Sequence, residues 1–294
     1  MSPTRGVPKV VVITGASSGF GLLTAVEVAK RGHIVFATMR DLAKSTALGE
    51  ACRSAGVTVH QRRVDVTDTP SIKTVMGELV DTYGRIDVLV NNAGAGSVGF
   101  AYDLSDDDVR QHFETNLLGA MRCTRAVVPT MRANGCGTII NVSSVAGRSA
   151  APFLGAYSAS KFALEGWSES LRYELAPAGV RVCLIEPGTF RTPMYTESPA
   201  QSPAPPADSA AARQLRRVEL SFFEHARRHG GDPKRVARTI ADVVDKCTRF
   251  RVVIGRDARI ELLARRLLPD EAFGRAMERF IWRRWVEESK STES

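Results

Sequence analysis

The sequence predicts an α/β protein built on a single doubly wound parallel sheet. Two observations support this prediction. Over the first 190 residues, short apolar segments alternate with longer amphipathic ones. The short segments are rich in Val and Ile and almost continuously apolar, as is typical of parallel strands that helices cover on both faces. Six strand–helix units in a row therefore indicate a parallel sheet with right-handed crossovers.

The predicted strands are bounded by turn residues, and the predicted helices lie between them. The strands cover residues 9–14, 33–38, 57–66, 86–94, 137–144 and 180–188. The helices cover residues 20–31, 42–55, 70–83, 105–133 and 156–177. Ligands of such sheets bind beyond the carboxyl ends of the strands, so these ends are where a site is expected.

The alternation of strands and helices stops after Pro193, which divides one predicted domain into three parts. Residues 1–193 form the core, and residues 194–231 form a loop or lid. The lid contains a stretch rich in Pro, Ala and Ser that cannot pack a core. Residues 232–294 supply C-terminal helices and a last strand at 251–255. Neither an internal repeat nor a second apolar core is evident, which favours one domain.

The composition excludes several classes of protein. Hydrophobic residues make up 44% of the chain and charged residues 24%, which is enough apolar material for a filled core. No apolar run approaches the ~20 residues of a membrane-spanning helix, and the N-terminus is too short and polar for a secretory signal. The five cysteines and five histidines show no metal-ligand spacing. We therefore expect a cytoplasmic protein with reduced cysteines and no metal site.

A glycine-rich turn, TGASSGFG, spans residues 14–21 between the first strand and the first helix. Gly15, Gly19 and Gly21 allow a tight turn and close approach of the backbone to a ligand. The N-terminus of the following helix offers unpaired N–H groups and a positive dipole end to phosphate. The spacing G-x-x-x-G-x-G differs from the G-x-G-x-x-G fingerprint, and such a turn alone is a weak signal. Its position favours dinucleotide binding over an ordinary turn.

The end of the second strand predicts which dinucleotide is bound. A site for NAD carries a carboxylate there to hold the ribose 2′-hydroxyl, whereas an arginine accommodates a 2′-phosphate. Met39 and Arg40 occupy this position, and the carboxylate is absent. Asp41 directly precedes a helical segment and is interpreted as its N-cap. We therefore predict NADP(H) as the cofactor, with NAD(H) less favoured.

A tyrosine stands four residues before a lysine in AYSASKFALEGW, at residues 156–167. Residues i and i+4 lie on one helix face, so an ammonium at Lys161 can stabilise the phenolate of Tyr157 and lower a pKa that is ordinarily ~10. The same spacing also fits a helix surface on which the tyrosine packs and the lysine is solvated. Only the surrounding motifs can decide between the two interpretations.

Seven short segments recur at predicted strand ends and helices. They are TGASSGFG (14–21), DV (65–66), NNAG (91–94), NLLG (116–119), NVSS (141–144), YSASK (157–161) and PGTFRTPM (187–194). Over residues 8–193 the chain thus resembles the short-chain dehydrogenase/reductase family, whose motifs occur in this order. Within the family, ATMRD and YSASKFALEGWSESL are most similar to the branch of 17-beta-hydroxysteroid and retinol dehydrogenases. The resemblance implies a Rossmann-type fold and a nicotinamide-dependent oxidoreductase.

The resemblance also implies four catalytic roles. Tyr157 is the general acid in carbonyl reduction, or the base in alcohol oxidation, and Lys161 lowers its pKa and hydrogen-bonds the nicotinamide ribose. Ser144 donates a hydrogen bond to the substrate oxygen; its neighbour Ser143 is a competitor, but a spacing of thirteen residues to Tyr157 favours Ser144. Asn116 holds a water that links Lys161 to solvent. Two preplaced donors suit this chemistry, because they stabilise the charge that develops on the carbonyl oxygen.

The cofactor contacts implied by the resemblance come from most of these motifs. The set is Gly15, Ser17, Ser18, Gly19, Phe20, Gly21, Arg40, Asp65, Val66, Asn92, Ala93, Gly94, Tyr157, Lys161, Pro187, Gly188 and Thr192. Asp65 is expected at the adenine, Asn92 and Gly94 at the adenosine ribose, and residues 187–192 at the nicotinamide. Asp65 as a turn former and Asn92 as a strand-end cap are the ordinary alternatives.

The lid and the loop before Tyr157 are expected to line the substrate site. In the family that the chain resembles, the lid loop sets substrate specificity. The candidate substrate contacts are Ser144, Tyr157, Phe153, Phe190 and Met194, with Leu154, Tyr195, Phe222 and Phe223 as further candidates. An apolar wall of this kind suits a bulky hydrophobic ketone or alcohol. Core packing is the more frequent fate of such side chains.

We therefore expect an NADP(H)-dependent oxidoreductase that interconverts a carbonyl and an alcohol on a lipophilic small molecule, such as a steroid, a retinoid or a polyketide-like ketone. Two alternatives remain open. One is an NADP-dependent epimerase or other tailoring enzyme, and the other is a nucleotide-binding regulator without turnover. The complete catalytic set argues against the regulator.

The C-terminal part of the chain is basic. Residues 213–294 contain 20 Lys and Arg against 13 Asp and Glu, and so carry most of the net charge of +8. A predicted last helix at 270–289 has an apolar face and an arginine-bearing face, formed by Phe273, Met277, Phe280, Ile281 and Trp285, and by Arg275, Arg279 and Arg283. We favour packing on the domain or on a partner subunit over contact with a membrane surface or an anionic carrier.

Other partners follow from the same considerations. The basic residues lack aromatic interleaving and a known motif, so nucleic-acid binding is not expected. The family resemblance implies a homodimer or homotetramer that associates through the helices at 105–133 and 156–177.

Overall fold

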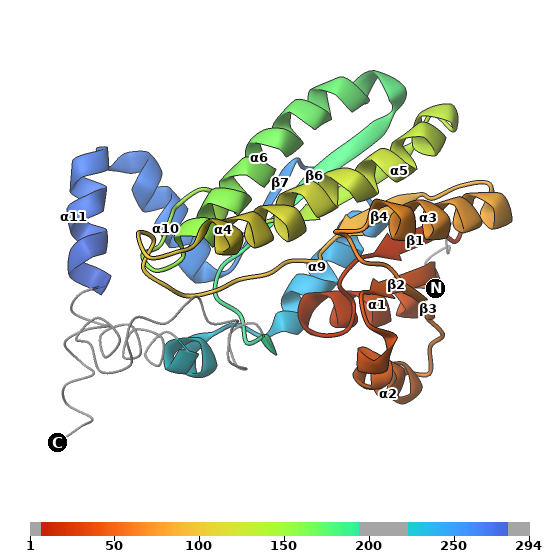
Figure 1. Cartoon of the computed structure of the whole chain (residues 1–294), viewed down its shortest axis with the longest axis horizontal. Helices are drawn as coiled ribbons and strands as arrows, with labels where there is room; N and C mark the ends of the chain where they lie inside the picture. Colours follow the sequence, from red (N-terminus) through yellow and green to blue (C-terminus); the bar gives the residue numbers. More distant parts are fainter. Residues whose placement is uncertain (1–6, 194–222, 282–294) are drawn as a thin grey trace, which may run out of the picture.

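A seven-stranded parallel sheet forms the centre of the molecule (Figure 1). The computed structural model describes residues 7–193 and 223–281. The strands are β1 (Val10–Ile13), β2 (Ile34–Met39), β3 (His60–Arg63), β4 (Val88–Asn91), β5 (Gly137–Val142), β6 (Val180–Pro187) and β7 (Arg251–Ile254). Their order in the sheet is β3-β2-β1-β4-β5-β6-β7. The predicted doubly wound, Rossmann-type fold in a single domain is confirmed.

Helices cover both faces of this sheet (Figure 1). They are α1 (Gly19–Lys30), α2 (Thr46–Ala55), α3 (Thr69–Tyr83), α4 (Asp106–Phe113), α5 (Gly119–Ala133), α6 (Gly155–Leu175), α9 (Pro233–Asp245), α10 (Arg256–Leu267) and α11 (Asp270–Ile281). Helices α1, α2 and α9 bury their apolar sides against one face, and α3, α5 and α6 do so against the other.

The central strand β1 shows why its sequence is apolar without alternation. Val11 and Ile13 belong to the core that α1 and α9 cover, whereas Val10 and Val12 belong to the core beneath α3 and α5. All four side chains are at most 1% exposed. A strand whose side chains alternate between two covered faces has no polar face, and β1 is therefore Val/Ile throughout.

The strand β3 is shorter than predicted. The expected strand covered residues 57–66, but only His60–Arg63 pairs with β2. These four residues are largely exposed, because β3 is an edge strand. Val64 and Val66 are buried below the strand end without belonging to the ladder, so their apolar character reflects packing in the loop and not strand pairing.

The long helix predicted at 105–133 is interrupted by a π-helical turn. α4 ends at Phe113, Glu114–Leu118 forms the π turn, and α5 continues from Gly119. The turn contains Asn116, one of the predicted catalytic residues. Such single π turns inside α-helices are frequent at functional sites. A Cβ on Gly119 would lie 2.8 Å from Val66 Cγ2, so the helix restarts where it packs closely on the loop after β3.

The C-terminal segment completes the same sheet. The predicted last strand at 251–255 corresponds to β7, which pairs with the carboxyl half of β6. Asp232 caps α9 by accepting a hydrogen bond from the backbone N–H of Lys234 at 2.9 Å. At the other end of α9, Asp245 contacts Arg31 and His33, which holds this helix against α1. Residues 232–254 are thus part of the core architecture.

Two segments on either side of the predicted lid lie directly against each other. Phe190, after β6, and Gly231, before α9, form a parallel bridge. The N–H of Gly231 donates to the carbonyl of Thr189 at 2.9 Å, and the N–H of Arg191 donates to the carbonyl of Gly231 at 3.1 Å. The segment after β6 and the segment before α9 are therefore held together by backbone hydrogen bonds.

Helix α11 packs on α10 through its first turn. Phe273 is 8% exposed and lies beneath the Arg265 guanidinium, 5.3 Å from the carbon to the ring centroid. Phe280, in the last turn, is 50% exposed. The predicted helix reached residue 289; Arg283 and Trp285 lie outside the described residues. Within residues 7–193 and 223–281, no helix has the length and apolarity needed to cross a membrane.

Candidate active site

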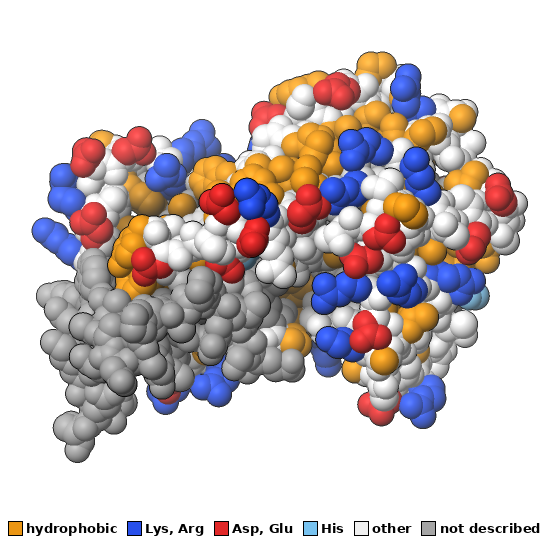
Figure 2. Space-filling model, viewed as in Figure 1, with side chains coloured by type: hydrophobic (Ala, Val, Ile, Leu, Met, Phe, Trp, Pro, Cys, Tyr) orange, Lys and Arg blue, Asp and Glu red, His pale blue; other side chains and the backbone are white. Residues whose placement is uncertain are grey.

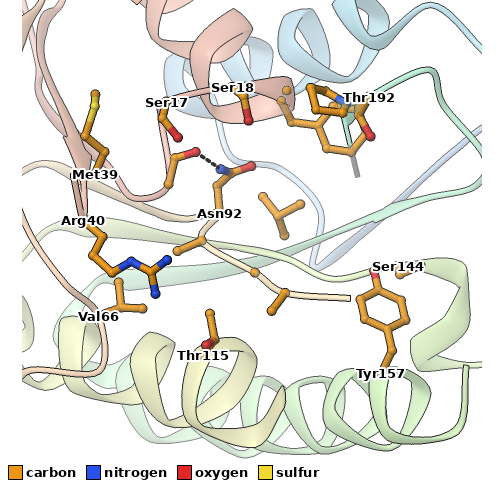
Figure 3. Close-up of a pocket in the computed structure, with 18 of the residues that line it drawn as sticks. Ser17, Ser18, Met39, Arg40, Val66, Asn92, Thr115, Ser144, Tyr157 and Thr192 are labelled. Atoms are coloured by element: carbon orange, nitrogen blue, oxygen red, sulfur yellow. Dashed lines mark hydrogen bonds between the residues drawn. The ribbon is translucent and has the colours of Figure 1, made fainter. Parts of the chain in front are cut away.

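A cavity of about 360 Å³ lies at the carboxyl ends of β1, β2, β4, β5 and β6, where the sequence predicts a ligand (Figure 3). Most of the predicted cofactor and catalytic residues line it: Gly15, Ser17, Ser18, Gly19, Phe20, Arg40, Asp65, Val66, Asn92, Ala93, Gly94, Ser144, Tyr157, Lys161, Pro187, Gly188 and Thr192. Residues from six of the seven motifs, far apart in the sequence, thus share one site, because parallel strands end at the same edge of the sheet.

The glycine turn forms one wall of the cavity. Gly15 and Gly19 have φ values of +66° and +55°, in the left-handed region that favours glycine. A Cβ on Gly15 would lie 2.7 Å from the Cα of Ala93, and a Cβ on Gly21 would lie 2.5 Å from Nδ2 of Asn92. Gly21 itself does not line the cavity; it allows the turn to pack. Helix α1 begins without a side-chain cap, so its first N–H groups are available to an anion.

Asn92 holds the glycine turn in place. Its side-chain Nδ2 donates to the carbonyls of Thr14 at 2.9 Å and Gly15 at 3.0 Å. In return, the Thr14 hydroxyl oxygen accepts from the backbone N–H groups of Asn92 and Ala93, both at 3.0 Å. The bond from Asn92 Nδ2 to the Thr14 carbonyl links the residue that follows β4 to the residue that follows β1. The alternative of a strand-end cap is therefore realised, and Asn92 also lines the cavity as predicted.

Arg40 marks one end of the cavity. Figure 3 shows its guanidinium beside Val66, at the end opposite Tyr157. Burial favours a raised pKa for the nearby Asp65 carboxyl, but hydrogen bonds from Thr67 and the charges of Arg40 and Arg63 outweigh burial and hold this pKa below its ordinary value.

The carboxylate of Asp41, the residue after Arg40, is engaged in a helix cap and does not face a ligand. It accepts from the N–H of Ala43 at 2.9 Å and caps the 3-10 turn Leu42–Ser45. The predicted N-cap is confirmed. The side chains at the end of β2 that line the cavity are accordingly Met39 and Arg40.

Tyr157 and Ser144 define the other end. Tyr157 projects from the first turn of α6, and in Figure 3 its hydroxyl points toward Ser144. Ser144 follows β5, and its hydroxyl oxygen accepts from the N–H of Ala146 at 3.1 Å, which fixes its orientation. Ser143 also borders the cavity, but its hydroxyl lies against Gly147, where a Cβ would be 2.9 Å away. The structure thus directs Ser144 rather than Ser143 toward the tyrosine.

Lys161 lies one helical turn behind Tyr157. Its Nζ donates to the carbonyl of Val142 at 2.8 Å and is 5.7 Å from the centroid of the Tyr157 ring. The side chain is 4% exposed. Burial lowers the pKa of Lys161 from 10.5 to about 8, and the Glu165 carboxylate opposes this shift. The lysine is therefore a buried ammonium beside the tyrosine near neutral pH, and a solvated surface lysine is excluded.

Asn116 ties the loop after β4 to α6. Its Oδ1 accepts from the N–H of Ala95 at 2.7 Å, and its Nδ2 donates to the carbonyl of Ala95 at 3.0 Å and to the Ser160 hydroxyl at 2.9 Å. The Ser160 hydroxyl in turn donates to the carbonyl of Tyr157 at 2.7 Å. The side chain of Asn116 lies behind the cavity wall and organises it through these bonds; the water predicted there stays a prediction.

The predicted substrate side is only partly correct. Phe190 is 1% exposed and packs edge-on against Phe20 at 5.9 Å, within the core covered by α1 and α9, so its assignment to the cavity wall is wrong. Phe153 packs against Phe100, with ring centroids 5.3 Å apart, and does not line this cavity; its predicted contact with the substrate stays a prediction. Met194, Tyr195 and Phe222 lie outside the described residues.

Sequence reasoning missed three polar residues on the cavity wall, Thr67, Gln111 and Thr115. Gln111 and Thr115 come from α4 and the π turn, and both line the cavity. Their spacing of four, directly before Asn116, would have indicated a shared helix face. Elsewhere in the described part of the chain, no group of three His, Cys, Asp or Glu side chains could hold a metal ion. All five cysteines are free thiols.

This cavity joins a glycine turn and a helix N-terminus at one end to a tyrosine, a serine and a buried ammonium at the other. Together with the fold, it defines a dinucleotide-dependent oxidoreductase that acts on carbonyl or alcohol groups. A family model described as short chain dehydrogenase matches residues 9–203. The chain belongs to the short-chain dehydrogenase family, as its motifs predict.

Characterised and uncharacterised relatives agree with this assignment. The chain is 41% identical over 269 residues to the uncharacterized oxidoreductase YusZ of Bacillus subtilis, covering 90% of this chain and 95% of YusZ. It is 37% identical to 3-ketodihydrosphingosine reductase of Bacteroides thetaiotaomicron, covering 84% and 88%. Human retinol dehydrogenase 8 is 41% identical over 65% of this chain and 60% of its own length. The retinol dehydrogenase branch named from short motifs is thus among the relatives.

Solved structures show the same fold. A short-chain dehydrogenase from Streptomyces avermitilis has a TM-score of 0.76 at 34% identity and covers 98% of this chain and 100% of its own. A metagenomic short-chain oxidoreductase in complex with NADP has a TM-score of 0.66 at 28% identity, with 84% and 96% covered. A Burkholderia phymatum short-chain dehydrogenase/reductase in complex with NAD has a TM-score of 0.76 at 26% identity, with 90% and 96% covered.

Proposed function

We propose that this protein is an NADP(H)-dependent oxidoreductase that interconverts a ketone or aldehyde and an alcohol on a lipophilic small molecule. One observation carries the proposal: Tyr157, Ser144 and Lys161 converge at the end of the cavity that lies opposite Arg40 and the glycine turn. This order of groups along the cavity suits an extended dinucleotide with its reactive ring beside the tyrosine.

The residues of the cavity fit such a cofactor. The glycine turn lacks side chains where a pyrophosphate would lie, and the first N–H groups of α1 face the same place. Pro187, Gly188, Thr192 and Lys161 border the region for the nicotinamide and its ribose. A bound nicotinamide nucleotide supplies or accepts the hydride.

The chain's own residues manage the proton and the charge. In reduction, the Tyr157 hydroxyl donates its proton to the substrate oxygen, and Ser144 donates a hydrogen bond to the same oxygen. The buried ammonium of Lys161 favours the phenolate that remains on Tyr157. In oxidation the same phenolate accepts the proton of the alcohol. Asn116 holds the backbone of Tyr157 in place through Ser160.

The preference for NADP(H) is inferred from the end of β2. Arg40 reaches the cavity, and Asp41 is engaged in capping, so a carboxylate is not presented to a ribose 2′-hydroxyl there. An always-charged planar guanidinium suits a 2′-phosphate. Structural relatives in complex with NADP and with NAD both exist, so the argument depends on this chain's own side chains.

Replacing Arg40 with alanine is therefore expected to raise the KM for NADPH about ten-fold and to leave the KM for NADH nearly unchanged. A hydrogen bond to a charged group contributes roughly 1.5 kcal/mol or more, which corresponds to this factor. Steady-state kinetics with both nucleotides measure it. Arg62→Ala, on the exposed edge strand β3, removes a neighbouring charge that does not line the cavity. The assignment of Arg40 to the 2′-phosphate would be refuted if both variants raised the KM for NADPH equally. It would also be refuted if Arg40→Ala raised the KM for NADPH and for NADH by the same factor.

A lipophilic substrate is inferred from the names of relatives. Relatives named 3-ketodihydrosphingosine reductase and retinol dehydrogenase support it. The test is the change in NADPH absorbance with a panel of steroid, retinoid and long-chain ketones, and with the matching alcohols and NADP⁺. Net oxidation of NADPH supports the reductase. Conversion of a substrate without net change in NADPH would indicate an epimerase, and nucleotide binding without any turnover would indicate a regulator.

We also propose that the protein forms a homo-oligomer through α5 and α6. Figure 2 shows hydrophobic side chains gathered on the surface over these helices. On α6, Phe162 is 43% exposed and Tyr173 is 62% exposed. Exposed apolar side chains that gather on one face are typical of a protein–protein interface. Sedimentation of the purified chain tests this.

Packing of Phe273 on α10 supports the interpretation of α11 as a packed helix, with a membrane or carrier contact as the less favoured role.

A further inference from the structure

A buried carboxylate lies directly behind the predicted proton-transfer residues. Glu165 follows Lys161 by one helical turn on α6 and is 5% exposed. Glutamate is rarely buried to this extent unless it is paired. The roles assigned above to Tyr157, Ser144, Lys161 and Asn116 do not involve it. Those roles therefore do not account for a buried carboxylate two helical turns after Tyr157 on α6.

Glu165 belongs to a charged cluster that joins four elements. Arg251 of β7 contacts Glu165 Oε2 through Nε at 3.1 Å, Glu186 Oε1 through Nε at 3.3 Å, and Glu169 Oε2 through Nη2 at 2.8 Å. Arg148, after β5, contacts Glu186 Oε2 at 3.1 Å. Glu186 is fully buried at the end of β6, one residue before the cavity wall begins.

The cluster has more acidic than basic members. Three carboxylates, from Glu165, Glu169 and Glu186, face the two guanidinium groups of Arg148 and Arg251. The third cation beside Glu165 in the described part of the chain is the ammonium of Lys161, whose charged form the Glu165 carboxylate favours. When all three carboxylates are ionised, the cluster is neutral only if that ammonium is counted with it.

The space between Glu165 and the cavity is tightly filled. A Cβ on Gly147 would lie 2.9 Å from Ser143 Oγ, 3.0 Å from the carbonyl of Lys161 and 3.1 Å from Glu165 Cγ. Glu165 Oε1 and Ser143 Oγ are both shielded from solvent. Charges separated by protein atoms rather than water interact strongly, so the effect of Glu165 on Lys161 is little screened.

We propose that Glu165 is a positioning residue: its carboxylate, fixed by Arg251, keeps Lys161 in the ammonium form beside Tyr157. This inference rests on the proposed function of the Tyr157–Lys161 pair. It adds a role for β7, because Arg251 comes from the last strand and orients the carboxylate from across the sheet. The C-terminal segment therefore contributes to the proton-transfer site without entering the cavity.

The ionisation of the pair confines this arrangement to a window of pH. Burial, with a contribution from the Glu186 charge, raises the pKa of Glu165 from 4.5 to about 7, although Ser143 and Arg251 oppose the shift. Burial lowers the pKa of Lys161 to about 8, and Glu165 opposes that shift. Glu165 is ionised above about pH 7 and Lys161 is charged below about pH 8. Both charges coexist mainly between these values, and Glu169, Glu186, Arg148 and Arg251 are the other groups that face the pair.

The direct test is the titration of Lys161 in the purified full-length chain, followed by NMR of lysine labelled with ¹³C at Cε. The Lys161 signal is assigned by its loss in Lys161→Arg. In Glu165→Gln, which keeps the shape and removes the charge, the Lys161 midpoint is expected to move to lower pH. In Glu165→Asp, which keeps the charge and changes the shape, the midpoint is expected to stay nearer to that of the unsubstituted protein.

The matched control is Glu169→Gln. Glu169 carries the same charge, binds the same Arg251 and lies one turn further along α6, but it is solvent-accessible. Its loss is expected to leave the Lys161 midpoint in place. An unmoved midpoint in Glu165→Gln, or an equal shift in Glu169→Gln, would overturn the proposal. If Glu165→Gln does not fold, the unsubstituted protein decides: its Lys161 signal must show a second inflection near pH 7, and a single inflection would be contradictory.

Activity provides a separate readout. The alkaline limb of the pH profile of kcat/KM for ketone reduction is expected to move to lower pH in Glu165→Gln and to stay in Glu169→Gln.

The proposed function and the proposed role of Glu165 would be contradicted by different results. Absence of turnover by the unsubstituted protein would remove the proposed function, whereas the NMR titration needs no substrate and still measures the coupling. Turnover with an unmoved Lys161 midpoint would leave the function and remove the role of Glu165.

Discussion

Replacing Tyr157 with phenylalanine is expected to lower kcat for ketone reduction by about 10²–10⁴-fold, the usual contribution of a positioned proton donor. The substitution removes one hydroxyl and keeps the ring, which is 6% exposed and packed within 5.7 Å of the Lys161 ammonium. Nucleotide binding is expected to persist, because the glycine turn and Arg40 are untouched. NADPH absorbance measures the rate, and the change in NADPH fluorescence on binding measures the affinity.

The control for this variant lies on the same helix. Tyr173 is 62% exposed on α6, four turns beyond the cavity, and Tyr173→Phe removes the same atom. Its kcat is expected to equal that of the unsubstituted protein. Turnover that survives in Tyr157→Phe at more than about a tenth of the original rate would show that another group donates the proton.

Replacing Gly21 with alanine is expected to weaken NADPH binding by more than about ten-fold and to lower the free energy of unfolding by about 1–3 kcal/mol. The added Cβ would lie 2.5 Å from Asn92 Nδ2 and would collide with the carbonyl of Gly15. Relief requires the turn to move away from Asn92, which breaks the two hydrogen bonds that hold it. Fluorescence titration with NADPH and urea denaturation measure the two effects.

Gly77→Ala provides the comparison. Gly77 lies within α3 and is exposed, and a Cβ there would meet nothing within 4 Å. Alanine is favoured over glycine inside a helix by roughly 0.8–1 kcal/mol, so this variant is expected to be slightly more stable and to bind NADPH normally. Normal NADPH affinity in Gly21→Ala would mean that the turn does not form the nucleotide site in the proposed way.

The fold could be predicted from the sequence because its signals are local. Each buried strand is continuously apolar, and each is followed by a turn and an amphipathic helix. The length of β3 could not be predicted in this way, since Val57, Val64 and Val66 are apolar for packing against neighbouring elements and not for pairing. The π turn at Glu114–Leu118 was also missed, because one extra residue in a helical turn does not alter the apolar pattern enough to be read.

The candidate site was predictable to the extent that its residues follow one another at fixed spacing. The glycine turn and the Tyr157–Lys161 pair are of this kind, and the structure brings them to one cavity. Phe190 was misassigned because an aromatic residue in a loop carries no sign of whether it faces a ligand or the core. The contact between Glu165 and Arg251 joins residues 86 positions apart and depends on the placement of β7 beside β6, which no local pattern encodes.

The bridge between Phe190 and Gly231 has an evolutionary consequence. Because backbone hydrogen bonds join residues 189–191 to Gly231, the length or sequence of residues 194–222 can change without altering the register of β6 in the sheet. Divergence confined to that segment leaves Thr192 and the other cavity residues in place.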